Sequence, residues 1–186
     1  MGKIIIVAGI LAGGKTTFSL KLSQKLKIPC FNKDLMKIEL GKAMEVNNRE
    51  ESIKLSRATA HLLLHITEIM MKTGSPFIIE GNFKDTEKTK LIELLETYCY
   101  RPLTFLFTGN TDVMHRRFLE REHSPERHSV HKMYGLLDNV LEFEQLIKPL
   151  LEFNAGGKIV RIDTGDFSKI NFDDYIKEGA LLINEG

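Results

Sequence analysis

Residues 9–16 near the start of the sequence have the composition and spacing of a phosphate-binding loop. Gly9, Gly14, Lys15 and Thr16 form the pattern G-x-x-x-x-G-K-T, between a buried-strand pattern (Lys3–Ala8) and a helical one. The glycines let the backbone bend tightly, so that several N–H groups can point at one polyphosphate. The helix that follows adds the positive end of its dipole. We therefore predict that this segment binds nucleotide phosphates.

Within the loop, Lys15 is long enough to reach the outer phosphates, and the Thr16 hydroxyl is a suitable ligand for Mg²⁺. A chance glycine turn would rarely reproduce the whole pattern between a strand and a helix. A signal peptide would need a longer apolar run and a small-residue cleavage site. The remaining loop positions are expected to contact the nucleotide as well: Gly9, Ala12, Gly13, Gly14 and Thr17.

Two acidic residues follow predicted strands. Glu80 directly follows the apolar run Phe77–Ile79, and Asp34 follows the pattern Ile28–Phe31. An acid at a strand end beside a phosphate loop binds Mg²⁺, usually through water, so we predict a metal site formed by Thr16 and Glu80. A carboxylate near the γ-phosphate can accept the proton of an attacking hydroxyl, and we predict this role of general base for Asp34. The alternatives are an ordinary polar strand end for Glu80 and a helix N-cap for Asp34.

Arginines gather in one predicted helix and in the polar loop after it. Arg117 and Arg121 are spaced i, i+4 and share a helix face, and Arg127 follows in the loop Ser124–His128. Guanidinium groups neutralise the negative charge that develops during phosphoryl transfer, and closure of such a flap excludes water. We predict that at least one of the three contacts phosphate. A solvated, ion-paired helix face is the alternative.

The histidines match no zinc-binding pattern. Four of the six lie between His115 and His131, with no cysteine nearby. One of these four is expected to help bind substrate in the flap, although the sequence does not indicate which. His61 and His65 share one face of a long helix and are interpreted as core or groove-lining residues.

Strand and helix patterns alternate along the 186 residues. This alternation predicts an α/β fold with a mostly parallel sheet that is covered on both faces, and one domain over residues 1–186. Strands are predicted at 3–8, 28–31, 76–80, 103–107 and 158–162. Helices are predicted at 16–27, 35–44, 48–72, 85–98, 112–122, 130–150 and 170–183.

Ligands of parallel sheets bind beyond the carboxyl ends of the strands, and the polar candidates lie there. The phosphate loop, Asp34 and Glu80 each follow a different strand, and Asp163–Gly165 follows the last one. This last segment is interpreted either as part of an adenine pocket, with Thr164 as the contact, or as a simple turn. The shared location predicts a single site at one edge of the sheet.

Composition excludes some function classes only weakly. The net charge of +1 creates no global field for nucleic acid or an anionic membrane, although a local basic patch remains possible. No apolar run is long enough to span a membrane. Cys30 and Cys99 are far apart and fit no metal pattern, so we interpret them as reduced thiols and expect a cytoplasmic protein.

Together these motifs resemble those of a group of small P-loop kinases that includes polynucleotide kinase, zeta toxin and chloramphenicol phosphotransferase. The resemblance implies a three-layer P-loop NTPase fold with a five-stranded parallel sheet, helices on both faces and an arginine-bearing lid. It also implies ATP and Mg²⁺ as donor and cofactor. The motifs that carry it are Gly9-x4-Gly14-Lys15-Thr16-Thr17, Asn32-Lys33-Asp34, Ile78-Ile79-Glu80-Gly81-Asn82, Arg117-x3-Arg121-x5-Arg127 and Ile162-Asp163-Thr164.

The function that the resemblance implies is transfer of the γ-phosphate of ATP to a hydroxyl of a small-molecule or nucleoside-like acceptor. Its catalytic residues would be Lys15, Asp34, Arg117, Arg121 and Arg127, with Arg121 also contacting the nucleotide. Three alternatives stay open: a nucleotide hydrolase that drives a conformational switch, a 5′-hydroxyl polynucleotide kinase, and a non-catalytic nucleotide-binding regulator. Nucleic acid is a possible partner but is not favoured.

Overall fold

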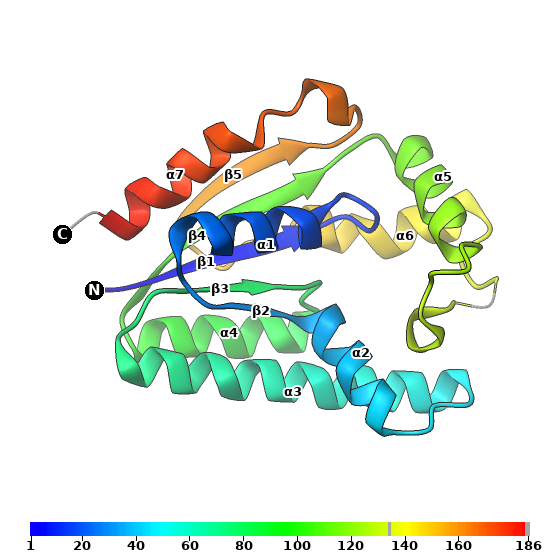
Figure 1. Cartoon of the computed structure of the whole chain (residues 1–186), viewed down its shortest axis with the longest axis horizontal. Coiled ribbons are helices and arrows are strands. Elements are labelled where there is room, and N and C mark those ends of the chain that lie inside the picture. The colour runs from blue at the N-terminus through cyan, green and yellow to red at the C-terminus, as the bar shows by residue number, and fades with distance from the viewer. Residues whose placement is uncertain (134, 185–186) are drawn as a thin grey trace.

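A five-stranded parallel sheet forms the centre of the protein in a computed structural model that describes residues 1–133 and 135–184 (Figure 1). The strand order is β2-β3-β1-β4-β5. All four neighbouring pairs are parallel, as the alternation of strands and helices predicted. The strands are β1 (Gly2–Gly9), β2 (Cys30–Asn32), β3 (Phe77–Glu80), β4 (Tyr100–Thr108) and β5 (Lys158–Asp163).

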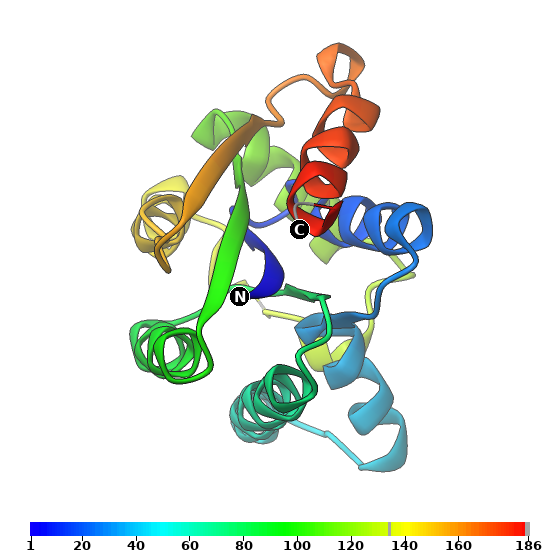
Figure 2. The same cartoon turned by 90° about the vertical axis from the view of Figure 1, so that its left-hand side faces the viewer.

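Helices cover both faces of this sheet (Figure 2). They are α1 (Lys15–Leu26), α2 (Lys33–Ala43), α3 (Arg49–Thr73), α4 (Asp85–Thr97), α5 (Thr111–Glu122), α6 (Val140–Leu151) and α7 (Phe172–Asn184), with 3₁₀ turns η1 (Ser129–His131) and η2 (Phe167–Lys169). Figure 2 shows α1 and α7 on one side of the sheet and α4 and α6 on the other. In Figure 1 the carboxyl ends of the strands point toward α2 and α5.

The core follows from the alternation of side chains along the central strand. Ile4 and Ile6 face α3 and α4, whereas Ile5 and Val7 face α1 and α7, and all four are fully buried. A strand that is buried on both faces needs such a continuous apolar run, and β1 has it. The central strand therefore holds the phosphate loop at its carboxyl end.

One predicted helix is wrong in its first half. The range 130–150 contains the short turn η1 and an irregular stretch before α6, which begins only at Val140. Gly135 has a φ of 81°, which a right-handed helix does not allow, and the side chain of Asn139 caps α6 by accepting a hydrogen bond from Leu141 N at 2.9 Å. Residue 134 of the predicted range lies outside the described residues. The apolar residues Val130 and Leu137 are buried, but in a folded loop.

None of the helices in the described ranges is long and apolar enough to cross a membrane. Both cysteines, Cys30 and Cys99, are free thiols.

Candidate active site

The loop after β1 is folded tightly around the side chain of Lys15. Gly9 has a φ of 114°, and a Cβ there would lie 2.2 Å from the carbonyl oxygen of Phe107, so only glycine fits. Lys15 is 8% exposed, and its Nζ donates hydrogen bonds to the carbonyl oxygens of Gly9 (3.1 Å) and Ile10 (2.6 Å). Burial lowers the pKa of Lys15, whereas the negative charges of Glu80 and Asp34 oppose that shift.

Glu80 lies beside this loop because of the strand register. It pairs with Val7 of β1 on one side and with Asn32 of β2 on the other. Its Oε2 atom lies 3.2 Å from the Thr16 hydroxyl and also accepts a hydrogen bond from the Asn32 side-chain amide. Glu80 is 2% exposed, and burial raises its pKa to about 7, although the positive charge of Lys15 opposes that shift.

This arrangement of Thr16 and Glu80 suits a hard divalent cation. A hydroxyl and a carboxylate beside a phosphate-binding loop supply the oxygen ligands that Mg²⁺ prefers, and phosphate and water would complete its octahedron. Within the described ranges, no three His, Cys, Asp or Glu side chains form a metal-binding group. The residues therefore fit Mg²⁺ bound jointly by protein and substrate better than a metal held by protein alone.

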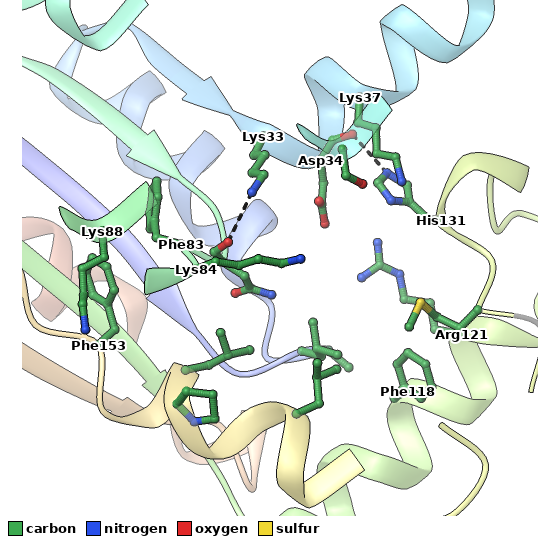
Figure 3. A pocket seen from close by; sticks show the side chains of 18 of the residues that line it. Lys33, Asp34, Lys37, Phe83, Lys84, Lys88, Phe118, Arg121, His131 and Phe153 are labelled. Atoms are coloured by element: carbon green, nitrogen blue, oxygen red, sulfur yellow. Dashed lines mark hydrogen bonds between the residues drawn. The ribbon is translucent and has the colours of Figure 1, made fainter. Parts of the chain in front are cut away.

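A cavity of about 500 Å³ adjoins the phosphate loop, and Leu11 and Ala12 form part of its wall. Figure 3 shows Asp34 from α2 and Arg121 from α5 extending into this cavity from opposite sides. Asp34 lies in the first turn of α2, which begins here because the Asn32 side chain accepts a hydrogen bond from Leu35 N at 3.0 Å. Asp34 is exposed, so its carboxylate is available to a ligand in the cavity.

The cavity has two chemically different walls. Cationic side chains line the wall made by α2, α3 and α4. Leu146, Pro149 and Leu150 of α6, together with Phe153, form an apolar wall. A ligand that fits this cavity therefore has both an apolar face and polar or charged groups.

The segment 123–133, which follows α5 and includes η1, is called the lid segment below, and it is docked onto α2 and α3. Lys37 Nζ donates to the carbonyl oxygen of Val130 (2.5 Å) and to the Ser52 hydroxyl (2.9 Å), and Ser52 donates to the same carbonyl (2.7 Å). His131 Nε2 lies 3.1 Å from the backbone oxygen of Asp34. Lys37 is 5% exposed and is therefore not the solvated lysine that is usual at such a position. This burial lowers the pKa of Lys37 to about 8.

Docking of the lid segment requires a glycine on α2. A Cβ at Gly41 would lie 2.5 Å from Val130 Cγ1. We expect Gly41→Ala to displace the lid segment and raise amide hydrogen exchange at residues 124–133, while α2 itself gains about 1 kcal/mol of helix propensity. Mass spectrometry would measure amide hydrogen exchange in the lid segment and in α2. Lys42→Ala, at the exposed neighbouring position, is the control. Unchanged protection of the lid segment in Gly41→Ala would contradict this role.

The three predicted arginines have different environments. Arg121 extends into the cavity, and its charge acts on both Lys15 and Glu80. Arg127 also lines the cavity, but its guanidinium lies 3.4 Å from Glu122 and donates to the carbonyl oxygen of His131 at 2.9 Å. Arg127 therefore holds the lid segment in shape while it faces the site.

Arg117 points away from this cavity, although it is spaced i, i+4 from Arg121. It donates to the carbonyl oxygens of Thr164 and Gly165 (3.1 Å to Gly165) and lies 4.3 Å from the ring centre of Phe167. Thr164 is fully buried, and its hydroxyl donates to Thr108 O at 2.9 Å. Thr164 thus supports the loop after β5, and a ligand there would meet neighbouring atoms rather than its side chain.

The histidines also separate into groups. His115 is largely buried, with Nε2 2.8 Å from Leu137 O and its ring packed on Phe143, so it belongs to the core. His61 and His65 are exposed on α3 and line a second cavity, which agrees with a groove-lining rather than a core position.

Solved structures show which fold this is, whereas the sequence matches no protein-family model and no curated protein. A protein from Chloroflexus aurantiacus described as a candidate kinase is similar with a TM-score of 0.86 and 23% identity, over 97% of this chain and 98% of that one. A shikimate kinase from Acinetobacter baumannii, solved with shikimate, gives 0.60 and 14%, over 98% and 93%. A gluconokinase from Sinorhizobium meliloti gives 0.55 and 15%, over 98% and 95%.

The chain has the fold of the P-loop kinases. At such low identities the comparisons establish the fold alone. The narrower resemblance to the group of polynucleotide kinase, zeta toxin and chloramphenicol phosphotransferase stays a prediction.

Within this P-loop kinase fold, sequence reasoning did not single out Asn32 or Arg49 as site residues. Asn32 contacts Glu80 and caps α2, and its position directly before Lys33 and Asp34 at a strand end was the available signal. Arg49 lines the cavity from the first turn of α3, where its charge looks like that of any solvated helix start. Only the fold brings it to the site.

Proposed function

We propose that the protein is an ATP-dependent phosphotransferase that moves the γ-phosphate to a hydroxyl of a small-molecule acceptor. The observation that carries this proposal is the cavity that joins the phosphate loop to Asp34 and Arg121 (Figure 3). A group bound there would lie between a phosphate donor, a carboxylate base and a guanidinium. These three are the requirements of in-line phosphoryl transfer.

On the donor side, Lys15 and the backbone of the loop would bind the phosphates of ATP. Lys15 would exchange its bonds to the carbonyl oxygens of Gly9 and Ile10 for phosphate oxygens. Thr16 and Glu80 would hold Mg²⁺, and the bound ion would neutralise negative charge on the phosphates. The buried environment of Glu80 strengthens this electrostatic interaction because little water screens it.

On the acceptor side, Asp34 would accept the proton of the attacking hydroxyl and orient its oxygen. Arg121 would neutralise charge that develops on the transferred group. Arg127 would assist from the docked lid segment, whose closure keeps water from competing with the acceptor.

We place the adenine at the opposite end of the loop. Phe167 lies beside Gly14, where a Cβ would be 3.1 Å from its ring, and Arg117 stacks on the same ring. This aromatic and cationic surface, together with the backbone at Gly165, suits a planar base. In this proposal Arg117 therefore serves the nucleotide base rather than the phosphates.

The apolar wall of the cavity favours a transferase over a hydrolase. A hydrolase needs room only for a water molecule, whereas Leu146, Leu150 and Phe153 form a surface that would bury part of an organic acceptor. A non-catalytic regulator would need neither this cavity nor Asp34 facing it.

The test is transfer from γ-labelled ATP·Mg²⁺ to a panel of nucleosides, 5′-hydroxyl oligonucleotides, aminoglycosides and sugars. We expect a labelled acceptor, and no label with Lys15→Ala. Release of free phosphate at a rate that no acceptor changes would favour a hydrolase. ATP binding without any turnover would favour a regulator.

The metal assignment leads to a separate prediction for Glu80→Gln. We expect the Mg²⁺ concentration for half-maximal transfer to rise on the order of 10–100-fold, because the carboxylate that orients the metal is lost. A Mg²⁺ titration of the transfer rate measures this, with Thr16→Ser, which keeps the hydroxyl, as the control. An unchanged titration curve for Glu80→Gln would exclude Glu80 from the metal site.

A further inference from the structure

A second cavity of about 770 Å³ lies between α3 and α4, next to the cavity that holds Asp34. The two cavities share four lining residues, Lys33, Arg49, Ser56 and Lys84, and therefore adjoin. The second cavity, called the α3–α4 groove below, continues past Arg57 and His61 along α3. Three of the four residues at the junction are cationic.

The positive charge of this groove is only partly neutralised by its own acids. Glu87 pairs with Lys33 at 2.7 Å, so each satisfies the other. Glu68 also lines the groove, but it accepts a hydrogen bond from Tyr98 (2.9 Å) and pairs with Lys72 (3.0 Å), and neither of these partners lines the groove. Glu87 and Glu68 are thus already paired with other side chains.

In the part of the chain that the structure describes, two cations at the junction, Arg49 and Lys84, and one in the groove, Arg57, are not paired with an acidic residue. Within residues 1–133 and 135–184, the side chains of Arg49, Arg57 and Lys84 make no hydrogen bond or ion pair. The Nε atom of Arg49 is buried without a hydrogen-bond partner there, and so is the Oδ1 atom of Asn82 in the first cavity. A buried donor and a buried acceptor without partners cost free energy unless a ligand satisfies them. Arg49 needs an acceptor group, and Asn82 needs a donor such as a hydroxyl.

The cavity that contains Asp34 and the α3–α4 groove would bind different parts of a ligand. The first cavity alone is within the range that holds one small ligand. The groove is not needed for the reacting hydroxyl, which must lie near Asp34 and the phosphate loop. A ligand that fills both spaces would place a hydroxyl beside Asp34 and Asn82 and an anionic group between Arg49 and Lys84.

We propose that the acceptor is a hydroxyl compound that also carries a phosphate. Arg49 and Lys84 hold this phosphate at the junction, and Arg57 contacts it from the α3–α4 groove. This inference rests on the proposed function, because it names the class of acceptor for the same transfer. A phosphate dianion matches the guanidinium fork and the two neighbouring cations better than a neutral group does. Ser56, at the same junction, can donate a further hydrogen bond.

The test compares matched acceptors with and without a phosphate: thymidine and thymidine 3′-phosphate, ribose and ribose 5-phosphate, glycerol and glycerol 3-phosphate. We expect the phosphorylated member of at least one pair to have a kcat/KM higher by about tenfold or more. Arg57→Ala should raise the KM for that compound by about tenfold, with kcat within about twofold, and leave the neutral partner unaffected.

Lys54→Ala is the matched control, since Lys54 lies on the same helix, is exposed and lines neither cavity. Equal kcat/KM values within every pair, or equal effects of Arg57→Ala and Lys54→Ala, would overturn the inference while leaving the kinase proposal in place.

A binding measurement separates the two proposals if no acceptor is phosphorylated. Calorimetry would use the Asp34→Asn variant, with the phosphate loop saturated by a non-hydrolysable ATP analogue and Mg²⁺, and the three phosphorylated compounds as probes. Binding that weakens when Arg57→Ala is added would support the groove site although the kinase proposal had failed. Absence of binding would overturn the groove inference, whereas the kinase proposal is decided by the transfer assay with the full acceptor panel.

Discussion

Replacement of Lys15 by alanine is expected to abolish phosphoryl transfer, with a loss on the order of 10³-fold or more, because the lysine stabilises charge on the outer phosphates. The affinity for ATP should also fall by about 10–100-fold, as expected for loss of a charged hydrogen-bond donor. Thermal stability should change little. Among the residues that the structure describes, Lys15 Nζ donates hydrogen bonds only to the carbonyl oxygens of Gly9 and Ile10, so the desolvation cost that its removal relieves offsets the loss of these bonds.

Lys25→Ala is the matched control for this variant. Lys25 lies in the last turn of the same helix, α1, and is exposed, so its loss should affect neither activity nor nucleotide binding. Transfer rate, ATP affinity and thermal midpoint would be measured on both variants. A Lys15→Ala protein that still transferred phosphate at a tenth of the wild-type rate would contradict the role of the loop.

Asp34→Asn should separate binding from chemistry. We expect transfer to fall by about 10²–10⁴-fold, since an amide cannot accept the hydroxyl proton, while ATP affinity stays within about twofold. The substitution keeps the size of the side chain. The hydrogen bond from His131 uses the backbone oxygen of residue 34, so docking of the lid segment should also be unaffected.

Asp85 provides a carboxylate control in the same cavity. It lies in the first turn of α4, as Asp34 lies in the first turn of α2, but it is highly exposed and next to Lys88. Asp85→Asn should leave kcat within about twofold. Full activity in Asp34→Asn, or an equal loss in Asp85→Asn, would show that another group is the base.

The parts of the site that sequence predicted are those where local chemistry restricts the residue type. The loop after β1 needs glycine at positions 9 and 14, and a lysine and a hydroxyl at fixed spacing. Its pattern can therefore be recognised from the sequence alone. Glu80 and Asp34 could be placed because parallel strands share one carboxyl edge. The five strands were predicted for the same reason, as short apolar runs between helical patterns.

The parts that sequence did not predict depend on contacts between distant segments. Nothing local distinguishes Lys37 from a solvated lysine, and only its bond to Val130, across 93 positions, shows that it holds the lid segment. The spacing of Arg117 and Arg121 correctly placed both on α5, but a side chain as long as arginine can turn in either direction from one helix face. The helix expected at 130–150 failed at Gly135 and Asn139, whose backbone preferences outweighed a sufficiently apolar pattern.

The amide of Asn32 joins the two halves of the proposed reaction. Its oxygen fixes the first turn of α2, which carries Asp34, and its nitrogen holds the carboxylate of Glu80. A small rotation of α2 would therefore move Asp34, the proposed base, and through Asn32 also Glu80, the proposed metal ligand. In the proposed reaction the positions of Asp34 and Glu80 are thus coupled rather than independent. This coupling depends on Asn32 of β2, the shortest strand of the sheet.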